Sequence, residues 1–321
     1  MPRPFTNERG RVLLKAGLAK RHEPLRAYLG RSWPLYAMIL PGLLFILLFR
    51  YLPMYGVIIA FQDFSPAKGF AASRWVGFDN FDFLFSIPEF SRIFSNTLII
   101  AVLKLALDQL GAIVLALLIN EARNLVFRRS IQTLIYLPHF LSWIVLGGIL
   151  LDILSPFGIV NNVVRALGHE PQLFLGSNDW FRITIIGSSL WKGVGFSTVV
   201  YLAALTAISP TLQEAAAIDG AGRFRRIWHI ILPGIRPTVV LLAALSLGDV
   251  LQAGFEQILT LYSPAVYRTG DVIDTYVYRV GLVSAQYSLA GAVGLFKSVI
   301  GFFLIVASYW LADRYAGYRI L

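Results

Sequence analysis

The chain has 321 residues, of which 57% are hydrophobic and 14% are charged, and its mean hydropathy is +0.67. A water-soluble domain has about 25% charged residues, so this composition excludes an ordinary soluble protein. The absence of cysteine excludes disulfides, thiolate metal sites and a cysteine nucleophile. The four histidines lie far apart in the sequence, so no metal site is expected. These values indicate an integral membrane protein.

Six mainly apolar runs are each long enough to cross a bilayer, which takes about 20 residues. In chain order they are 33–52, 97–119, 131–154, 181–203, 237–255 and 290–312. Their apolar residues are continuous rather than alternating, which excludes an outer-membrane barrel. The first run is long and follows a basic arm, so a removable signal peptide is not expected. We therefore predict an all-α, polytopic membrane protein with six transmembrane helices.

Basic residues predict the orientation of these spans, because they collect on the cytoplasmic side. Arginine and lysine are in excess in the N-terminal arm, in the second-to-third and fourth-to-fifth connections, and at the C-terminus. Acidic residues balance them in the other connections, so both termini are predicted to be cytoplasmic. This pattern explains the net charge of +10 without nucleic acid. We predict two parts: a basic arm, 1–32, that lies on anionic lipid, and a membrane domain, 33–321.

The connection 211–237 has the clearest local signals in the chain. Thr211 and Glu214 have the spacing of a capping box, which predicts the start of a helix. Asp219 and Gly220 then predict a break, because glycine readily adopts a positive φ at a helix end. The connection is therefore expected to form a helix, a turn and a second helix outside the bilayer.

The second helix of this connection is predicted to end at Leu232-Pro233 and to have one apolar face rimmed by arginines. The residues of that face, at helical spacing, are Phe224, Ile227, Trp228 and Ile231. Such a face can lie in a groove on a soluble partner. It can equally rest on lipid, and the spacing alone leaves both alternatives open.

The same connection resembles the EAA loop of ABC importer permeases. The matching residues are Glu214, Ala215, Ala216, Asp219, Gly220, Ala221, Ile230, Ile231, Leu232, Pro233 and Pro237. Two further segments, 75–81 (WVGFDNF) and 274–279 (DTYVYR), resemble the carbohydrate-uptake branch of these permeases, the second of them its oligo- or polysaccharide members. The resemblance extends from about residue 33 to the C-terminus.

This resemblance implies a permease of the bacterial inner membrane that imports an oligosaccharide, with alginate as one candidate cargo. It implies a second permease subunit, two ATPase subunits and a periplasmic solute-binding protein as partners. ATP and Mg²⁺ would bind to the partner ATPase, and no cofactor is expected on this chain. The ATPase-docking residues that it implies are Glu214, Ala215, Ala216, Asp219, Gly220, Ala221, Phe224, Ile227 and Leu232.

Polar residues inside the predicted spans are candidates for a translocation path, because an ionisable group there costs about 2.5–3.5 kcal/mol or more. Lys104 and Asp108 lie one turn apart and are expected to pair. The tentative path residues are Trp191, Lys192, Asp249, Gln252 and Glu256, the last three at a spacing that predicts one helical face. The alternative is a network that only fixes helix packing. An anionic sugar would require cations, for which Lys192 and Lys297 are the candidates.

No catalytic residue is expected on this chain. The nearest match to a phosphate-binding loop, 291–298, has phenylalanine in place of the second glycine. An intramembrane protease would require a serine–histidine pair or two facing aspartates, and neither motif is evident. The alternative transporter, a secondary carrier driven by an ion gradient, would require an inverted repeat, which is not evident either.

Overall fold

The structure is a computed structural model that describes residues 25–122, 124–248 and 250–316. It has two units, Met1–Val57 and Ile58–Leu321. Most of the predicted basic arm, 1–32, lies outside the described residues, and so do residues 317–321. The prediction that the arm rests on lipid therefore remains a prediction.

The described part of the first unit, from Leu25, is one apolar helical segment. It begins with α2 (Leu25–Ile46) and continues through the π turn η1 (Leu47–Tyr51). The 3₁₀ helix η2 (Leu52–Phe61) begins in this unit and extends into the second. Two prolines lie inside α2, which a membrane helix tolerates when local changes of helical pattern satisfy the backbone groups that they free.

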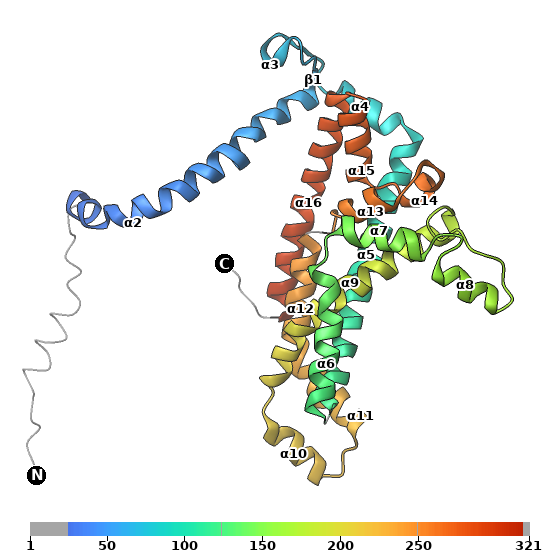
Figure 1. Cartoon of the computed structure of the whole chain (residues 1–321). Helices are drawn as coiled ribbons and strands as arrows, with labels where there is room; N and C mark the ends of the chain where they lie inside the picture. Colours follow the sequence, from blue (N-terminus) through green and yellow to red (C-terminus); the bar gives the residue numbers. More distant parts are fainter. Residues whose placement is uncertain (1–24, 123, 249, 317–321) are drawn as a thin grey trace, which may run out of the picture. The chain divides into compact units, whose positions relative to one another are not determined.

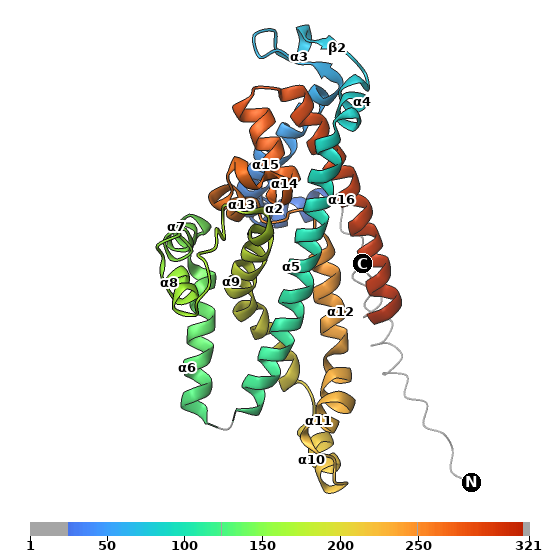
Figure 2. The same cartoon turned by 90° about the vertical axis from the view of Figure 1, so that its right-hand side faces the viewer.

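Four long helices form the frame of the second unit. They are α5 (Pro88–Glu121), α9 (Asn178–Thr206), α12 (Leu232–Gly248) and α16 (Tyr287–Ala316). Figure 2 shows that α5 and α9 descend toward the end of the unit that carries α10 (Pro210–Ile218) and α11 (Arg223–Arg226), and that α12 rises from it. We call this the coupling end of the unit and its opposite the outer end.

Short elements connect these helices. At the outer end, β1 (Gln62–Asp63) pairs antiparallel with β2 (Arg74–Trp75), and Gln62 lies opposite Trp75. The other elements are α3 (Gly69–Ala72), α4 (Asp79–Ser86), α6 (Leu125–Tyr136), η3 (Leu137–Phe140), α7 (Trp143–Ile153), α8 (Ile159–Ala166), η4 (Ile227–Ile231), α13 (Phe255–Leu261), η5 (Pro264–Val266), α14 (Tyr267–Gly270), α15 (Ile273–Val277) and η6 (Tyr278–Val283).

The buried side chains form apolar clusters at different heights of the second unit. One joins α5 and α9 to the segment between α12 and α15, and includes Ile100, Phe181 and Ile258. A second lies nearer the coupling end and includes Tyr201 and Ile235. The interior is therefore built around the contact between α5 and α9.

Five of the six predicted spans correspond to helices in the described part that are long and apolar enough to cross a membrane. The sixth, 131–154, corresponds to a bent pair, Leu125–Phe140 with Trp143–Ile153, which makes six spans if the pair is counted as one. The prediction of an all-α, polytopic membrane protein is therefore confirmed.

The third predicted span, 131–154, is broken rather than straight. The chain bends by 104° between its two helical parts. Pro138 lacks the N–H that would continue the helical pattern, and Ser142 begins the next helix by accepting a hydrogen bond from the Val145 N–H at 3.3 Å. The apolar pattern continues across the break, so hydropathy alone did not reveal it.

The bounds predicted for the fifth span, 237–255, are wrong. Its helix begins at Arg223 and ends at Gly248. Gly254 has a φ of +93°, a left-handed conformation that glycine adopts without strain, and α13 begins directly after it.

Candidate coupling loop and translocation path

The first helix of the loop, α10, begins without the predicted capping box. Its N-cap is Ser209, its first residue is Pro210, and no side chain caps it. The Thr211 hydroxyl is instead 2.7 Å from the Ser209 hydroxyl. Proline is well suited to this first position because its N–H would be unsatisfied there anyway, and it displaced the predicted start by one or two residues.

The end of α10 agrees with the prediction. Gly220 has a φ of +79°. The Ala221 N–H donates to the Ala216 carbonyl at 2.8 Å, and the Gly220 N–H donates to the Ala217 carbonyl at 3.2 Å. These two bonds form a Schellman motif, which satisfies the last carbonyls of the helix and fixes the direction of the chain beyond it.

The second helix of the loop does not end at Leu232-Pro233, as predicted, but continues into the fifth span. α11, the π turn η4 and α12 form one helix, Arg223–Gly248. The Leu232 N–H bonds to the Ile227 carbonyl, one residue further back than in an α-helix. Pro233 follows this π turn, where the α-helical pattern is already interrupted, so it does not end the helix.

The predicted apolar face of this helix is divided between two surroundings. Phe224 is 89% exposed and Trp228 is 70% exposed. Ile231 is buried, and Ile227 and Leu232 pack against the same internal cluster. The first pair is therefore the more accessible to another molecule. Ile227 and Leu232, which the resemblance implied as docking residues, are half-buried against this chain's own core, and their docking role stays a prediction.

Ile218 is an exposed apolar residue that the sequence analysis did not select. It ends α10 and is 87% exposed. Its position just before the Asp219-Gly220 turn, on the same loop as Phe224 and Trp228, was the available signal. We call Ile218, Phe224 and Trp228 the apolar tip of the loop.

The other implied docking residues are mostly on the surface of α10 and its turn. Glu214, Ala215, Asp219 and Gly220 are exposed, and Ala216 and Ala221 are half-buried. A cavity of about 500 Å³ lies between α10, the end of α9 and Arg226, and Glu214 is part of its wall. Arg223 also lies 3.7 Å from Glu121 at the end of α5. The loop thus has polar contacts with the rest of the second unit. Its apolar tip is mostly exposed in the described structure.

Inside the spans, the predicted pairing of Lys104 with Asp108 is wrong. Lys104 Nζ donates to the Ala253 carbonyl at 2.8 Å and to Gln257 Oε1 at 2.5 Å. Asp108 Oδ2 accepts from the Ser197 hydroxyl at 2.6 Å. Each group therefore bonds to another segment. Lys104 reaches a carbonyl that the break beyond α12 leaves free, which the sequence pattern did not reveal, and Asp108 accepts from α9.

The predicted polar face of the fifth span does not exist as one helical face. Asp249 lies outside the described residues. Gln252 and Glu256 are separated by the left-handed residue Gly254 and are not on one continuous helix. Both side chains are exposed. Their role in a path stays a prediction, and it no longer follows from helical spacing.

Trp191 and Lys192 lie on α9 and differ in their surroundings. Trp191 is half exposed. Lys192 Nζ donates to the carbonyls of His139 at 2.8 Å and Leu141 at 2.5 Å, and it lies 5.5 Å from the centre of the Trp143 ring. Lys192 is thus bound to the break in the third span.

Two cavities adjoin these groups. One has a volume of about 320 Å³, and its polar lining residues are Lys104, Asp108, Gln109, Ser189, Ser246, Gln252 and Gln257. The other, of about 940 Å³, lies between α12, α13, α15 and α16 and is mainly apolar. Lys297 in its wall forms an ion pair with Asp274. Both lysines predicted to meet an anionic sugar therefore already have partners in this structure.

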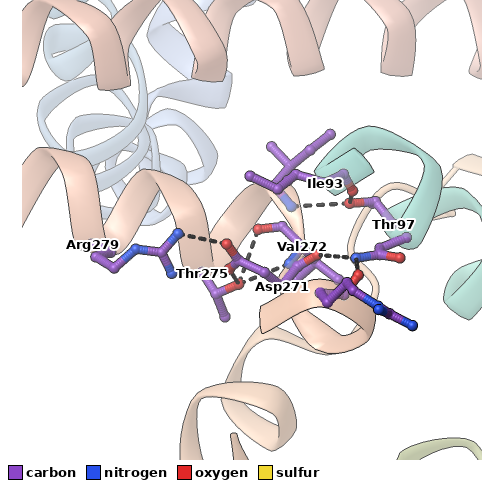
Figure 3. A network of polar contacts seen from close by, with 9 residues as sticks. Ile93, Thr97, Asp271, Val272, Thr275 and Arg279 are labelled. Atoms are coloured by element: carbon purple, nitrogen blue, oxygen red, sulfur yellow. Dashed lines mark hydrogen bonds and ion pairs between the residues drawn. The ribbon is translucent and has the colours of Figure 1, made fainter. Parts of the chain in front are cut away.

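A buried polar network holds the outer end together (Figure 3). Asp271 is 2% exposed, and its carboxylate accepts hydrogen bonds from Thr275 at 2.8 Å and from both Nη atoms of Arg279, at 3.1 and 2.5 Å. The Arg279 guanidinium also lies 4.3 Å from the centre of the Tyr267 ring. The spacing of Asp271, Thr275 and Arg279, four residues each, was a signal that the sequence analysis missed.

The charge of this network is fixed by its geometry. Burial lowers the pKa of Arg279, but the hydrogen bond and the charge of Asp271 outweigh burial and raise the pKa above its ordinary value. The guanidinium therefore stays charged. Asn96 on α5 donates to the Asp271 carbonyl at 3.2 Å, and Thr97 accepts from the Ile273 N–H at 2.9 Å. These bonds attach the α14–α15 segment to α5.

Comparison with known proteins agrees with this layout. The family described as "Binding-protein-dependent transport system inner membrane component" matches residues 109–317. Protein LplB of Bacillus subtilis (strain 168) is 44% identical and is aligned over 92% of this chain and 96% of its own. The polygalacturonan/rhamnogalacturonan transport system permease protein YteP of the same organism is 43% identical, over 88% of each chain.

A solved structure is similar over nearly the whole chain. It is a chain of a bacterial ABC transporter involved in the import of the acidic polysaccharide alginate, with 41% identity and a TM-score of 0.84. The similarity covers 91% of this chain and 99% of that one. The chain belongs to the family of inner membrane components of binding-protein-dependent transport systems. The resemblance to ABC importer permeases is thus confirmed, and so is a multi-pass location in the inner membrane.

Proposed function

We propose that this chain is the permease subunit of an ATP-driven importer of acidic oligosaccharides. Relatives more than 40% identical over about nine tenths of the chain are named for transport of polygalacturonan and rhamnogalacturonan or of alginate. These polymers share uronate units, so the cargo class is carbohydrate with carboxylate groups. Alginate, which the sequence suggested as a candidate, is one member of this class.

The observation that carries the proposal is the apolar tip at the coupling end. Ile218 and Phe224 are almost fully exposed on a loop whose backbone is fixed by a Schellman motif. A large apolar surface outside the bilayer favours a protein partner. We propose that the partner is an ATPase subunit, that two copies of it bind ATP and Mg²⁺, and that a second permease and a periplasmic solute-binding protein complete the importer.

The proposed path lies beside the broken spans. The cavity of about 320 Å³ presents amide, hydroxyl and charged groups, which suit the hydroxyls of a sugar. Trp191 is half exposed on α9, and an indole ring can stack against the apolar face of a sugar ring. Gln252 and Glu256 are exposed next to the break and remain candidate path residues together with Asp249.

Reconstitution with the genomically neighbouring transporter subunits tests this proposal. We expect uptake of uronate oligosaccharides into proteoliposomes to require ATP and the solute-binding protein, and to exceed uptake of neutral oligosaccharides of equal length. Uptake driven by an ion gradient without ATP would identify a secondary carrier and overturn the proposal.

Substitution of the loop tests the coupling role. Glu214→Lys reverses a charge on the exposed face of α10, so we expect normal membrane insertion but less uptake per ATP hydrolysed. Glu170→Lys makes the same change at another exposed position, far from the loop in sequence, and serves as the control. Equal uptake per ATP in both variants would contradict the docking assignment.

A further inference from the structure

We propose that Lys104 and Lys192 are positioning residues for transport, which together hold one gate composed of α7 and α13. The inference rests on the proposed transport function. In this proposal the two lysines bind backbone carbonyls at the breaks in the spans and do not bind the cargo.

The first step concerns the break in the third span. A break inside a membrane frees backbone carbonyls, and lipid offers no hydrogen bond to replace those lost. Lys192 Nζ lies 3.3, 2.8 and 2.5 Å from the carbonyl oxygens of Pro138, His139 and Leu141. A single ammonium group has three donors and here serves all three carbonyls. Lys192 therefore fixes the point at which α7 turns away from α6.

The second step concerns the break in the fifth span, where a lysine again donates to a free backbone carbonyl. Lys104 Nζ donates to the Ala253 carbonyl and to Gln257, on either side of Gly254. A Cβ atom at Gly254 would lie 2.7 Å from Lys104 Nζ, so a side chain there would displace the ammonium group, and the left-handed φ of +93° itself favours glycine. Gln257 Nε2 also donates to the Ile185 carbonyl on α9 at 2.7 Å. Lys104 therefore fixes the start of α13.

The third step is that both lysines are carried by one rigid pair of helices. Lys104 lies on α5 and Lys192 on α9. These helices are joined by hydrogen bonds from Ser197 to Asp108 and from Tyr201 to Gln109. They also pack closely, since a Cβ atom at Gly111 would lie 3.0 Å from a Val194 methyl group. The two lysines are thus fixed relative to each other.

The fourth step is that α7 and α13 contact each other directly. Gly147 of α7 is buried, and a Cβ atom there would lie 2.3 Å from Cγ2 of Thr260 on α13. The missing side chain at Gly147 therefore allows α7 and α13 to pack closely at this point. The segments that follow the two breaks therefore pack as one body, with α7 beside α13 (Figure 1). The hydrogen bonds of the two lysines connect this body to the α5–α9 pair.

The test measures the position of this gate with single cysteines, which is direct because the chain has none of its own. Reporters are Ile144→Cys on α7 and Leu259→Cys on α13, in the assembled transporter. Their labelling rates with a membrane-impermeant maleimide are measured without nucleotide and with trapped ATP. Each is combined with Lys104→Met or Lys192→Met, and Lys68→Met, an exposed lysine in an outer loop, is the control.

The decisive result is the cross-effect. Loss of the carbonyl partners shifts the gate equilibrium by roughly tenfold, so Lys192→Met should change labelling on α13 as well as on α7, and Lys104→Met should change both too. Labelling that changes only beside the substituted lysine would overturn the single gate. No change at either reporter would overturn the positioning role.

Glutamine variants distinguish the loss of carbonyl binding from a failure to fold. Lys104→Gln and Lys192→Gln keep N–H donors but remove the charge, so they should assemble and retain more than half of the wild-type labelling response. If the glutamine and methionine variants assemble and respond alike, carbonyl binding is not the function of these lysines and the proposal fails. Because labelling is read without cargo, failure here is distinct from failure of the proposed uptake.

Discussion

Two regions at opposite ends of the second unit differ in the exposure of their key side chains. At the outer end, Asp271 is buried and its carboxylate is fully used by Thr275 and Arg279. At the coupling end, Phe224 and Ile218 are exposed although the backbone around them is fixed. The outer network has its partners within the described part of this chain, whereas the apolar tip of the coupling end is the surface that we propose meets another molecule. Substitutions should therefore affect folding at the outer end and assembly at the coupling end.

The largest effect is expected from Asp271→Ala. Removing one partner of a buried ion pair leaves the other uncompensated, which costs about 3–5 kcal/mol. We expect a clear fall in the thermal unfolding midpoint of the detergent-solubilised protein. Asp63→Ala, at an exposed outer aspartate, should leave the midpoint unchanged. The double variant Asp271→Ala/Arg279→Leu should recover part of the loss, and further destabilisation there would contradict this interpretation.

A smaller effect, on assembly alone, is expected from Phe224→Ala. An exposed aromatic side chain at the centre of an interface contributes about 2 kcal/mol to binding. Co-purification of the ATPase subunit should therefore weaken by roughly thirtyfold, with an unchanged unfolding midpoint of the isolated chain. Phe127→Ala removes another exposed phenylalanine, on α6, and should not affect co-purification. A similar loss in both variants would show that general apolar contact, not the loop, holds the ATPase.

Gly220→Ala tests the rigidity of the loop. The residue has a φ of +79°, which costs a non-glycine residue about 1 kcal/mol. We expect α10 to be displaced and the rate of uptake per ATP to fall a few-fold. Gly222→Ala is the matched control, because Gly222 has a φ of −67° and open space around it. If Gly222→Ala has the larger effect, the Schellman turn is not what positions the loop.

The smallest effect is expected from Arg223→Ala. The Arg223–Glu121 pair is exposed on the arginine side, and such pairs contribute less than about 1 kcal/mol. A double-mutant cycle with Glu121→Ala, followed by thermal unfolding, should give a coupling energy near this limit. A value above about 2 kcal/mol would mean that the contact helps to hold the coupling end.

The sequence predicted what depends on composition and short motifs. Six spans, the turn at Gly220 and the resemblance of the loop all follow from local patterns that the structure preserves. Breaks inside apolar runs were not predicted, because Pro138 and Gly254 interrupt the backbone without interrupting hydropathy. Once these breaks are known, the partners of Lys104 and Lys192 are understandable, since free carbonyls attract buried ammonium groups.

The candidate site was only partly predictable for a related reason. Helical spacing placed Phe224, Ile227, Trp228 and Ile231 on one face, but it could not show that the bundle covers two of them. Continuation of the helix through Pro233 depends on the π turn before it, and no sequence signal marked that turn. The same limit applies to Gln252 and Glu256, whose common face required an unbroken helix.

The unbroken helix from Arg223 to Gly248 has a mechanical consequence. Its 26 residues, at about 1.5 Å each, form a lever of roughly 39 Å from the apolar tip to the break below α13. A tilt of about 10° at the near end displaces the far end by roughly 7 Å, about the width of a sugar ring. A displacement of Phe224 is thus transmitted along this one helix to the break before α13, without a chain of side-chain contacts between separate elements.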